Sequence, residues 1–339
     1  MFSKILVPLD GSARAERALP VAAHIAKTRN ATVTLLRVVS ELADVGGYMI
    51  PSVATDQGVI EREEFEARDY LNALAKSHML HGVKVETRVD FGLPAQVILD
   101  IVKTEGIDGV IIGSHGRTGL SRWVLGSVAQ PIVRNSTAPV LLLRQQGPAL
   151  DDDGSMRESP FRILVPLDGS ELAEAALEPA QIMGEVFATA GTYELHIARV
   201  IPFLNTSTPD KLREESRVEA LNYLDRISKR LTATGSGRAH ITSSVILEVD
   251  VADALARMTR AGELVTGSLI SDGCDLIAMA THGRTGLARL AMGSVTERVL
   301  SATIAPALII RPEVIKAASE GAASKSQPVT SPESWPALF

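Results

Sequence analysis

The feature that most constrains this fold is an internal duplication. The segment Ile5–Ser12, which reads Ile-Leu-Val-Pro-Leu-Asp-Gly-Ser, recurs residue for residue as Ile163–Ser170. Further along each copy, His115–Leu120 is matched by His282–Leu287, and a Gly-Ser-Val triplet follows in both. Identical segments in the same order indicate two copies of one structural unit. With 339 residues, the chain is long enough for two domains that each bury a core.

The stretch between the two copies has the composition of a linker. It contains Gly147-Pro148 and the acidic run Asp151–Gly154, which are turn-forming and polar. The chain after the second copy is rich in Ala, Ser and Pro and has no sustained periodicity, which is typical of a flexible tail. The sequence therefore predicts a first domain, a linker, a second domain and a flexible C-terminal tail, over residues 1–146, 147–160, 161–314 and 315–339.

Within each copy, short apolar runs alternate with segments of helical periodicity. Aromatic residues are only 4% of the chain, and the apolar runs are built from Val, Leu and Ile, which suits strands buried on both faces. The alternation predicts two repeated, doubly wound, open parallel sheets of five strands with helices on both faces. In the first copy the strands are predicted over residues 4–9, 31–39, 83–89, 108–113 and 139–143.

The same pattern makes two local predictions. The stretch 41–58 contains glycines and a proline and is predicted to be a long loop. The charged helices predicted over 61–80 and 212–231 are expected to turn Phe65 and Leu221, among other apolar residues, toward the sheet.

Glycines mark the end of the fourth strand and the start of the helix after it. Gly113 and Gly116 follow the strand, and Gly126-Ser127 precede a helical pattern that begins at Val128. The first N–H groups of a helix lack partners, and the helix dipole favours negative charge there. Asp10 follows the first strand, which is expected beside the fourth, where strand order reverses and where such sheets bind ligands. The sequence therefore predicts a seat for phosphate at this edge.

The chain resembles the universal stress protein family. The resemblance rests on Gly-x-x-Gly, nine residues and Gly-Ser after a strand, paired with the early Val-Pro-Leu-Asp-Gly-Ser. It covers about residues 3–144 and 161–312, so the chain looks like a tandem member. The resemblance implies a Rossmann-like fold similar to that of adenine-nucleotide alpha hydrolases. It also implies ATP, alone or with Mg²⁺, as the ligand.

The resemblance further implies roles for individual residues. The glycines and Ser127 match those that hold the phosphates and ribose of ATP, Asp10 matches an aspartate that contacts ribose or a metal-linked phosphate, and the main chain at Val38 matches the part that meets adenine. No residue is assigned a catalytic role or a resident metal. The candidate nucleotide-binding residues are Pro8, Leu9, Asp10, Val38, Ile112, Gly113, His115, Gly116, Arg117, Gly126, Ser127 and Val128 in the first copy, and Asp168, Val200, Gly283, Gly293, Ser294 and Val295 in the second.

Simpler roles remain open for several of these residues. Asp10 could cap the first helix, Ser127 and Ser294 could be ordinary helix starts, and Arg117 could be a solvated loop residue. The second copy also departs from the family pattern, because Ala280 stands where the first copy has Gly113. Nucleotide binding in the second copy is therefore open.

The leading interpretation is an ATP-binding stress-response or regulatory protein that senses the nucleotide without catalysis. A P-loop enzyme would need a lysine after the glycines, and a Rossmann dehydrogenase would have its glycine cluster after the first strand; the chain has neither. The alternatives are an interaction module with vestigial nucleotide sites and, as the enzymatic alternative, a slow ATPase or an adenylating enzyme. The chain lacks the His-x-Gly-His and Ser-Gly-Gly-x-Asp-Ser signatures that adenylating enzymes of similar fold usually carry.

Charge and hydropathy bound the partners and the location. The net charge is −6 and no block of Lys and Arg stands out, so nucleic-acid binding is not expected. No apolar run is long enough to span a bilayer, and the first residues pass directly into a predicted strand, so we expect a cytoplasmic protein without membrane contact. The fifth strands, 140–143 and 307–310, are apolar edges, so the two halves are expected to pair with each other, and a homodimer is open.

Overall fold

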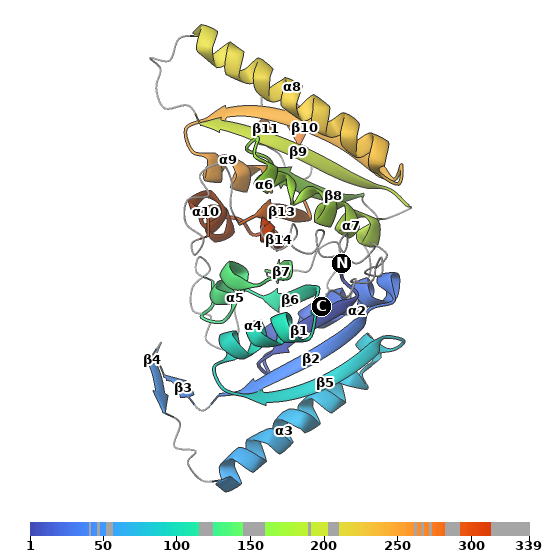
Figure 1. Ribbon diagram of the computed structural model, residues 1–339, viewed down its shortest axis with the longest axis vertical. Helices are drawn as coiled ribbons and strands as arrows, with labels where there is room; N and C mark the ends of the chain where they lie inside the picture. Colours follow the sequence, from blue (N-terminus) through green and yellow to red (C-terminus); the bar gives the residue numbers. More distant parts are fainter. Residues whose placement is uncertain are drawn as a thin grey trace, which may run out of the picture.

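The chain folds as the predicted class, an α/β structure around a mostly parallel sheet (Figure 1). The computed structural model describes residues 1–40, 42–45, 48–51, 57–114, 125–144, 160–188, 191–202, 210–260, 263–265, 268–270, 273–281 and 292–312. Four candidate residues lie outside this part of the chain, namely His115, Gly116, Arg117 and Gly283. The predicted tail and all of the predicted linker except Pro160 also lie outside it.

Each half contributes five strands to the central sheet. In the first half these are β1 (Lys4–Leu9), β2 (Thr32–Val39), β5 (Lys84–Phe91), β6 (Gly109–Gly113) and β7 (Val140–Leu143). In the second half they are β8 (Phe161–Pro166), β9 (Tyr193–Pro202), β10 (Ala239–Glu248), β13 (Leu276–Ala280) and β14 (Ala307–Ile310).

Helices connect the strands in the same order in both halves. The first half has α1 (Ala13–Glu16), α2 (Ala18–Arg29), α3 (Gln57–Ala75), a short 3₁₀ turn (His78–Leu80), α4 (Pro94–Thr104) and α5 (Ala129–Asn135). The second half has α6 (Glu171–Glu174), α7 (Leu177–Phe187), α8 (Asp210–Thr234), α9 (Val251–Met258) and α10 (Ser294–Ala302). None of the helices described is long and apolar enough to cross a membrane.

The two halves share one ten-stranded sheet, in the order β10-β9-β8-β13-β14-β7-β6-β1-β2-β5. Every neighbouring pair within a half is parallel. The two halves meet where β14 pairs antiparallel with β7, with Leu308 opposite Leu141. In Figure 1 these two strands lie at the middle of the molecule, and α3 and α8 lie at its two ends.

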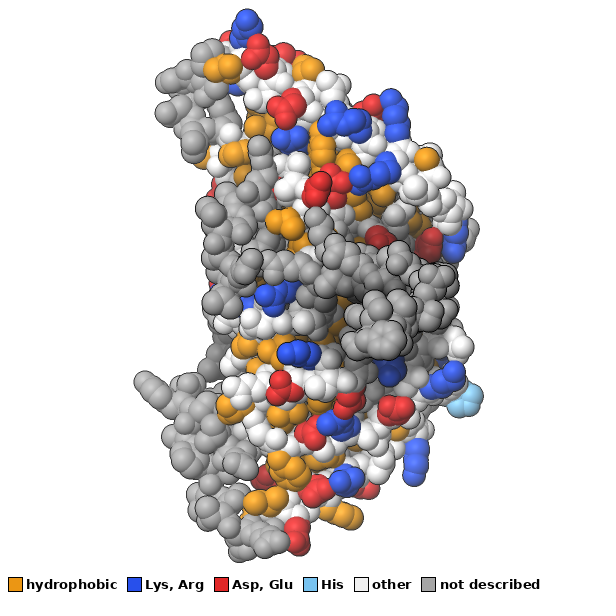
Figure 2. All heavy atoms as spheres, viewed as in Figure 1, with side chains coloured by type: hydrophobic (Ala, Val, Ile, Leu, Met, Phe, Trp, Pro, Cys, Tyr) orange, Lys and Arg blue, Asp and Glu red, His pale blue; other side chains and the backbone are white. Residues whose placement is uncertain are grey.

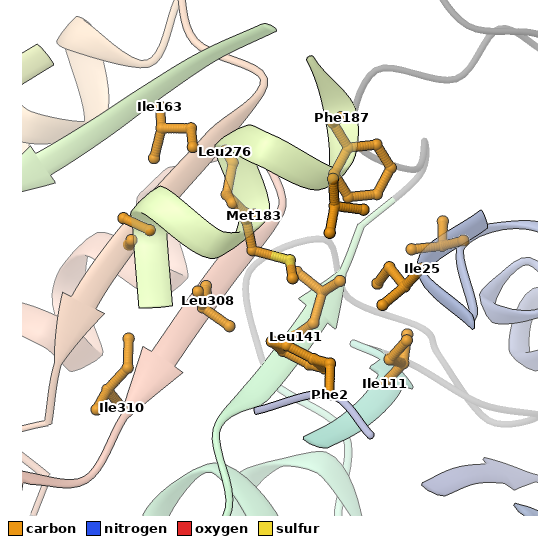
Figure 3. Packing of buried hydrophobic residues seen from close by; sticks show 14 of the residues in the cluster. Phe2, Ile25, Ile111, Leu141, Ile163, Met183, Phe187, Leu276, Leu308 and Ile310 are labelled. Atoms are coloured by element: carbon orange, nitrogen blue, oxygen red, sulfur yellow. The ribbon is translucent and has the colours of Figure 1, made fainter. Parts of the chain in front are cut away.

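The packing explains why the sheet is continuous across the junction. All residues of β7 and β14 are buried, as expected for central strands of a parallel sheet. One face of the sheet packs against α2, α3, α7 and α8 in a cluster that spans both halves. Figure 3 shows Leu141 of β7 in this cluster, near Phe2 and Ile111 of its own half and Met183 of the other. The opposite face packs against α4, α5, α9 and α10.

Further contacts join the halves on both sides of the sheet. The His24 ring of α2 stacks on the Phe187 ring of α7 with centroids 5.0 Å apart, and His24 Nε2 lies 2.9 Å from the Val186 carbonyl oxygen. On the other face, Arg134 of α5 donates to Glu297 of α10 at 2.7 Å. The helices that follow the two Gly-Ser pairs are therefore linked by an ion pair across the junction.

Two local predictions are wrong. The stretch predicted as a loop over 41–58 contains an antiparallel hairpin, β3 (Leu42–Val45) with β4 (Tyr48–Pro51), and the second half has another, β11 (Glu263–Val265) with β12 (Ser268–Ile270). Phe65 is 71% exposed and Leu221 is 40% exposed. Because a helix turns about 100° per residue, Phe65 lies on the opposite side of α3 from buried Ala67, and Leu221 lies at the edge of the buried stripe of α8.

The Asp108 carboxylate links the start of β1 to the start of β6 by hydrogen bonds. Its carboxylate accepts hydrogen bonds from the Ser3 and Lys4 amides, both at 2.8 Å, and from the Ser3 hydroxyl at 2.6 Å. Asp275 serves the second half in the same way, accepting from the Arg162 amide at 2.9 Å. Burial by itself would raise the pKa of Asp108, but these hydrogen bonds and the nearby amino terminus outweigh burial and lower it.

We expect Asp108→Ala to lower the free energy of unfolding by about 1–3 kcal/mol at neutral pH, because amide donors lose a charged acceptor. The lowered pKa sets the pH dependence: the contribution is complete above the carboxyl's unfolded pKa of about 4 and is lost as pH falls through the lower folded value. Urea unfolding at several pH values measures this. Exposed Asp100, changed to Ala, is the control and should shift stability by less than about 0.5 kcal/mol. An equal loss at all pH values would contradict this role for Asp108.

Candidate functional site

The predicted site lies where two neighbouring strands end. β1 pairs with β6 in parallel, with Leu6 opposite Val110, so both strands end at the same edge of the sheet. β1 continues through α1 and α2 to β2 on its other side, so strand order reverses between β1 and β6. Ligands of open α/β sheets bind at such a point. β8 and β13 repeat the arrangement in the second half.

A compact turn follows β1 and is built around Asp10. The Asp10 carboxylate oxygen Oδ1 accepts from the Ser12 amide at 3.0 Å and from the Ser12 hydroxyl at 2.6 Å. Ser12 Oγ in turn accepts from the Ala15 amide at 3.2 Å and caps α1. Asp10 therefore does not cap the helix itself, but orients the serine that does.

The second half reproduces this turn with nearly the same distances. Asp168 Oδ1 accepts from the Ser170 amide at 2.9 Å and from its hydroxyl at 2.6 Å, and Ser170 Oγ accepts from the Ala173 amide at 3.2 Å. Both aspartates are half-buried at the end of a strand. The two copies of this segment are thus identical in sequence and make the same hydrogen bonds.

The end of β6 is joined directly to the Gly-Ser pair. The Ser114 amide donates to the Leu143 carbonyl of β7 at 2.8 Å, and the Gly126 amide donates back to the Ser114 carbonyl at 2.9 Å. The first helical hydrogen bond follows, from the Gln130 amide to the Gly126 carbonyl at 3.0 Å. Gly113 and Gly126 are thereby held close to one another at the end of the strand.

The helix starts differ between the halves. α10 begins at Ser294 with Gly293 as its N-terminal cap, as the sequence predicts. In the first half α5 begins at Ala129, one residue after the predicted start at Val128, and Ser127-Val128 form the turn before it. The turn is nevertheless closed by the Gln130 bond, so its backbone already approaches helical hydrogen bonding.

Backbone packing accounts for the glycine of the Gly-Ser pair in the second half. The Gly293 amide donates to the Thr281 carbonyl at 2.7 Å. A Cβ at Gly293 would lie 2.9 Å from that same carbonyl oxygen, closer than real Cβ contacts come. Gly293 is one of the candidate nucleotide-binding residues, but closure of the chain onto the strand end already requires a glycine there.

The remaining candidate residues surround this edge at different depths. Pro8, Leu9 and Ile112 are buried in their strands and can offer a ligand only their main chain, whereas Val38, Val128 and Val200 are half-buried. The exposed positions are Ser127, Ser294 and Val295. Contact between these residues and a nucleotide stays a prediction. Among the described residues no group of three or more His, Cys, Asp or Glu could hold a metal ion.

The second half has an ion pair at its edge that has no counterpart among the described residues of the first half. Asp250 caps α9 by accepting from the Ala252 and Asp253 amides at 3.0 and 3.1 Å, and it also pairs with Arg298 of α10. The hydrogen bond from Arg298 is the main reason that the pKa of Asp250 is lowered. In the first half, α4 begins instead with Pro94 and has no side-chain cap.

The helix after the Gly-Ser pair also differs in charge. Glu297 stands in the first turn of α10, where the first half has the neutral Gln130. A carboxylate there opposes the binding of an anion at the helix start. The sequence already shows Asp250 as a difference between the copies, because it stands where the first copy has Gly92, and an aspartate directly before a helical pattern is a recognisable cap signal. No sequence pattern pointed to Arg298 or Glu297.

On the face of the molecule that Figure 2 shows, no patch of a single charge stands out among the described residues. In Figure 2, Lys and Arg side chains are interspersed with Asp and Glu over the two ends of the molecule. A face that binds nucleic acid would show clustered positive charge.

Comparison with known proteins gives the same result for both halves. The model of the universal stress protein family matches residues 1–144 and again residues 161–311. The curated universal stress protein YxiE of Bacillus subtilis is 34% identical over 149 residues, which are 42% of this chain and 100% of that protein. A universal stress protein of Mycolicibacterium smegmatis is 24% identical over 315 residues, covering 91% of this chain and 97% of its own.

Solved structures support the fold along the whole chain. The crystal structure of a universal stress protein from Archaeoglobus fulgidus superposes with a TM-score of 0.61 at 18% identity. The superposition covers 92% of this chain and 99% of that one. At this level of identity the comparison establishes the shared two-part architecture and nothing finer.

Proposed function

Because the chain belongs to the universal stress protein family, we propose that it is a cytoplasmic, ATP-binding regulatory protein of the stress response that does not catalyse a reaction of its own. The observation that most supports this proposal is the meeting of two hydrogen-bonded turns at one edge of the sheet. The Asp10 turn follows β1, and the Gly126 turn folds back onto the end of β6 beside it. Main-chain amides and a carboxylate at a switch point suit the phosphate and ribose of a nucleotide, with or without Mg²⁺.

We assign the nucleotide to the first half. The second half has Ala280 at the end of β13 where the first has Gly113, and it carries Glu297 and the Asp250–Arg298 ion pair near the corresponding edge. Ala280 adds a methyl group at the strand end, and Glu297, which pairs with Arg134, adds a carboxylate at the helix start. For the second half, the proposal is therefore an interaction module whose nucleotide site is vestigial.

The first expectation concerns the ligand. If the two turns seat phosphate, the protein binds ATP more tightly than adenosine, and isothermal titration calorimetry of the full chain measures both. Hydrolysis is expected to stay far below about 1 per second, because no water-activating base is assigned to the site. Equal affinities for ATP and adenosine would contradict the phosphate seat, and turnover at ordinary enzyme rates would favour the enzymatic alternative.

The second expectation concerns Gly113. Its φ is not positive, and the second half has alanine at the equivalent strand position, so Gly113→Ala is compatible with the backbone. We expect it to weaken ATP binding about ten- to a hundredfold, or roughly 1–3 kcal/mol, because the methyl group takes the ligand's space and removes a hydrogen bond.

Ala280→Gly is the matched variant in the other half. It should leave the first site unchanged and strengthen any weak second site, which the number of nucleotides bound per chain reports. Thermal melting shows whether both variants fold. Two equivalent sites in the wild type, or ATP binding untouched by Gly113→Ala, would show that the glycine does not face the nucleotide.

The third expectation concerns assembly. Without β14, the buried residues of β7 become an apolar sheet edge, which proteins cover by pairing. We therefore expect a fragment of residues 1–146 to self-associate through β7, and analytical ultracentrifugation measures its mass. A stable, monomeric fragment would show that this pairing is not needed to cover β7.

A further inference from the structure

A cluster of polar side chains lies behind the Asp10 turn and is repeated in the second half. Its residues come from different helices, strands and turns of the same half. In the first half these are Asp10, Glu16 of α1, Arg37 of β2 and Tyr70 of α3, and in the second half they are Asp168, Glu174, Arg199 and Tyr223. Neither the sequence pattern nor the family resemblance assigned a role to the two arginines.

Arg37 lies directly against the turn. Its Nη1 donates to the Leu9 carbonyl at a distance of 3.4 Å. On the far side of Asp10, Gly11 has a φ of +80°, and a Cβ there would lie 3.4 Å from the same Nη1. The guanidinium therefore lies close to the chain on both sides of Asp10.

Arg199 repeats this placement. Gly169 has a φ of +89°, and a Cβ there would lie 3.3 Å from Cζ, Nη1 and Nη2 of Arg199. The Arg199 side chain is only 11% exposed, and its guanidinium lies over the Tyr223 ring, 5.3 Å from the centroid. In both halves, a glycine with positive φ lets the backbone turn while a guanidinium lies beneath it.

The tyrosine and the glutamate beside the guanidinium are paired in the same way in both halves, and in the second half Glu174 also pairs with Arg230 and Arg199 with Glu219. The Tyr70 hydroxyl donates to Glu16 at 2.9 Å, and the Tyr223 hydroxyl donates to Glu174 at 3.0 Å. Burial, followed by the glutamate, raises the pKa of each tyrosine, so both remain neutral donors. The positive charge of Arg37 opposes that shift, which means that it acts on the same small region as the carboxylates of Asp10 and Glu16.

We propose that Arg37 is a positioning residue for the nucleotide: it braces the Asp10 turn from behind and offsets the carboxylate charge that a bound triphosphate must approach. This inference rests on the proposed function and deepens it. Asp10 alone would repel phosphate oxygens, and a fixed guanidinium on the other side of the turn reduces that repulsion. The effect is directed at the charged part of the ligand, so it distinguishes ATP from adenosine.

The test is calorimetry with ATP and with adenosine on the full chain and three variants. Arg37→Met should weaken ATP binding about tenfold and adenosine binding less than about twofold. Arg37→Lys, which keeps the charge, should retain most of the preference for ATP. Arg199→Met makes the same change in the second half and should bind both ligands as the wild type does.

The outcomes separate this inference from the proposed function. If the wild type binds no ATP, the proposed function fails and the inference fails with it. If the wild type binds ATP but Arg37→Met binds it equally well, or loses ATP and adenosine to the same degree, only the inference is overturned. Should Arg37→Met not fold, as judged by thermal melting, Arg37→Gln is measured in its place. Glutamine keeps a donor for the Leu9 carbonyl but removes the positive charge, so the same loss of ATP binding is expected.

Discussion

The antiparallel pairing of β7 with β14 is the interaction on which the rest of the structure depends. A five-stranded parallel half leaves its fifth strand with a row of unpaired amides and carbonyls on an apolar edge. Pairing these two strands satisfies both edges at once and joins two sheets into one. The junction also links α5 and α10 through Arg134 and Glu297, so the helices that follow the two Gly-Ser pairs are in direct contact.

The two halves share their turns but differ at the edge where those turns meet. The Asp10 and Asp168 turns have the same hydrogen bonds, and a guanidinium lies beneath each. Around the second turn, however, alanine ends β13 and a carboxylate stands in the first turn of α10. The two halves thus share the turn that builds the strand-to-helix connection and differ in the residues that end β13 and begin α10.

For several candidate residues, the structure gives a role in the fold that explains the residue type without a ligand. Ser12, not Asp10, caps α1, which leaves the aspartate oriented at the strand end. Gly293 is required by its approach to Thr281, so its presence in the motif does not by itself indicate a ligand. Gly113 does not have a positive φ, and alanine occupies the matching place in β13.

The sequence by itself determined the duplication, the alternation of strands and helices, and the sheet edge at which the repeated segments lie, because repeats and periodicity are local properties of the chain. Tertiary structure alone decided which face of a helix meets the sheet, as the exposure of Phe65 shows. It also decided that Arg37 of β2 lies beneath a turn that follows β1. Such contacts join residues far apart in the chain, and no local pattern of side chains encodes them.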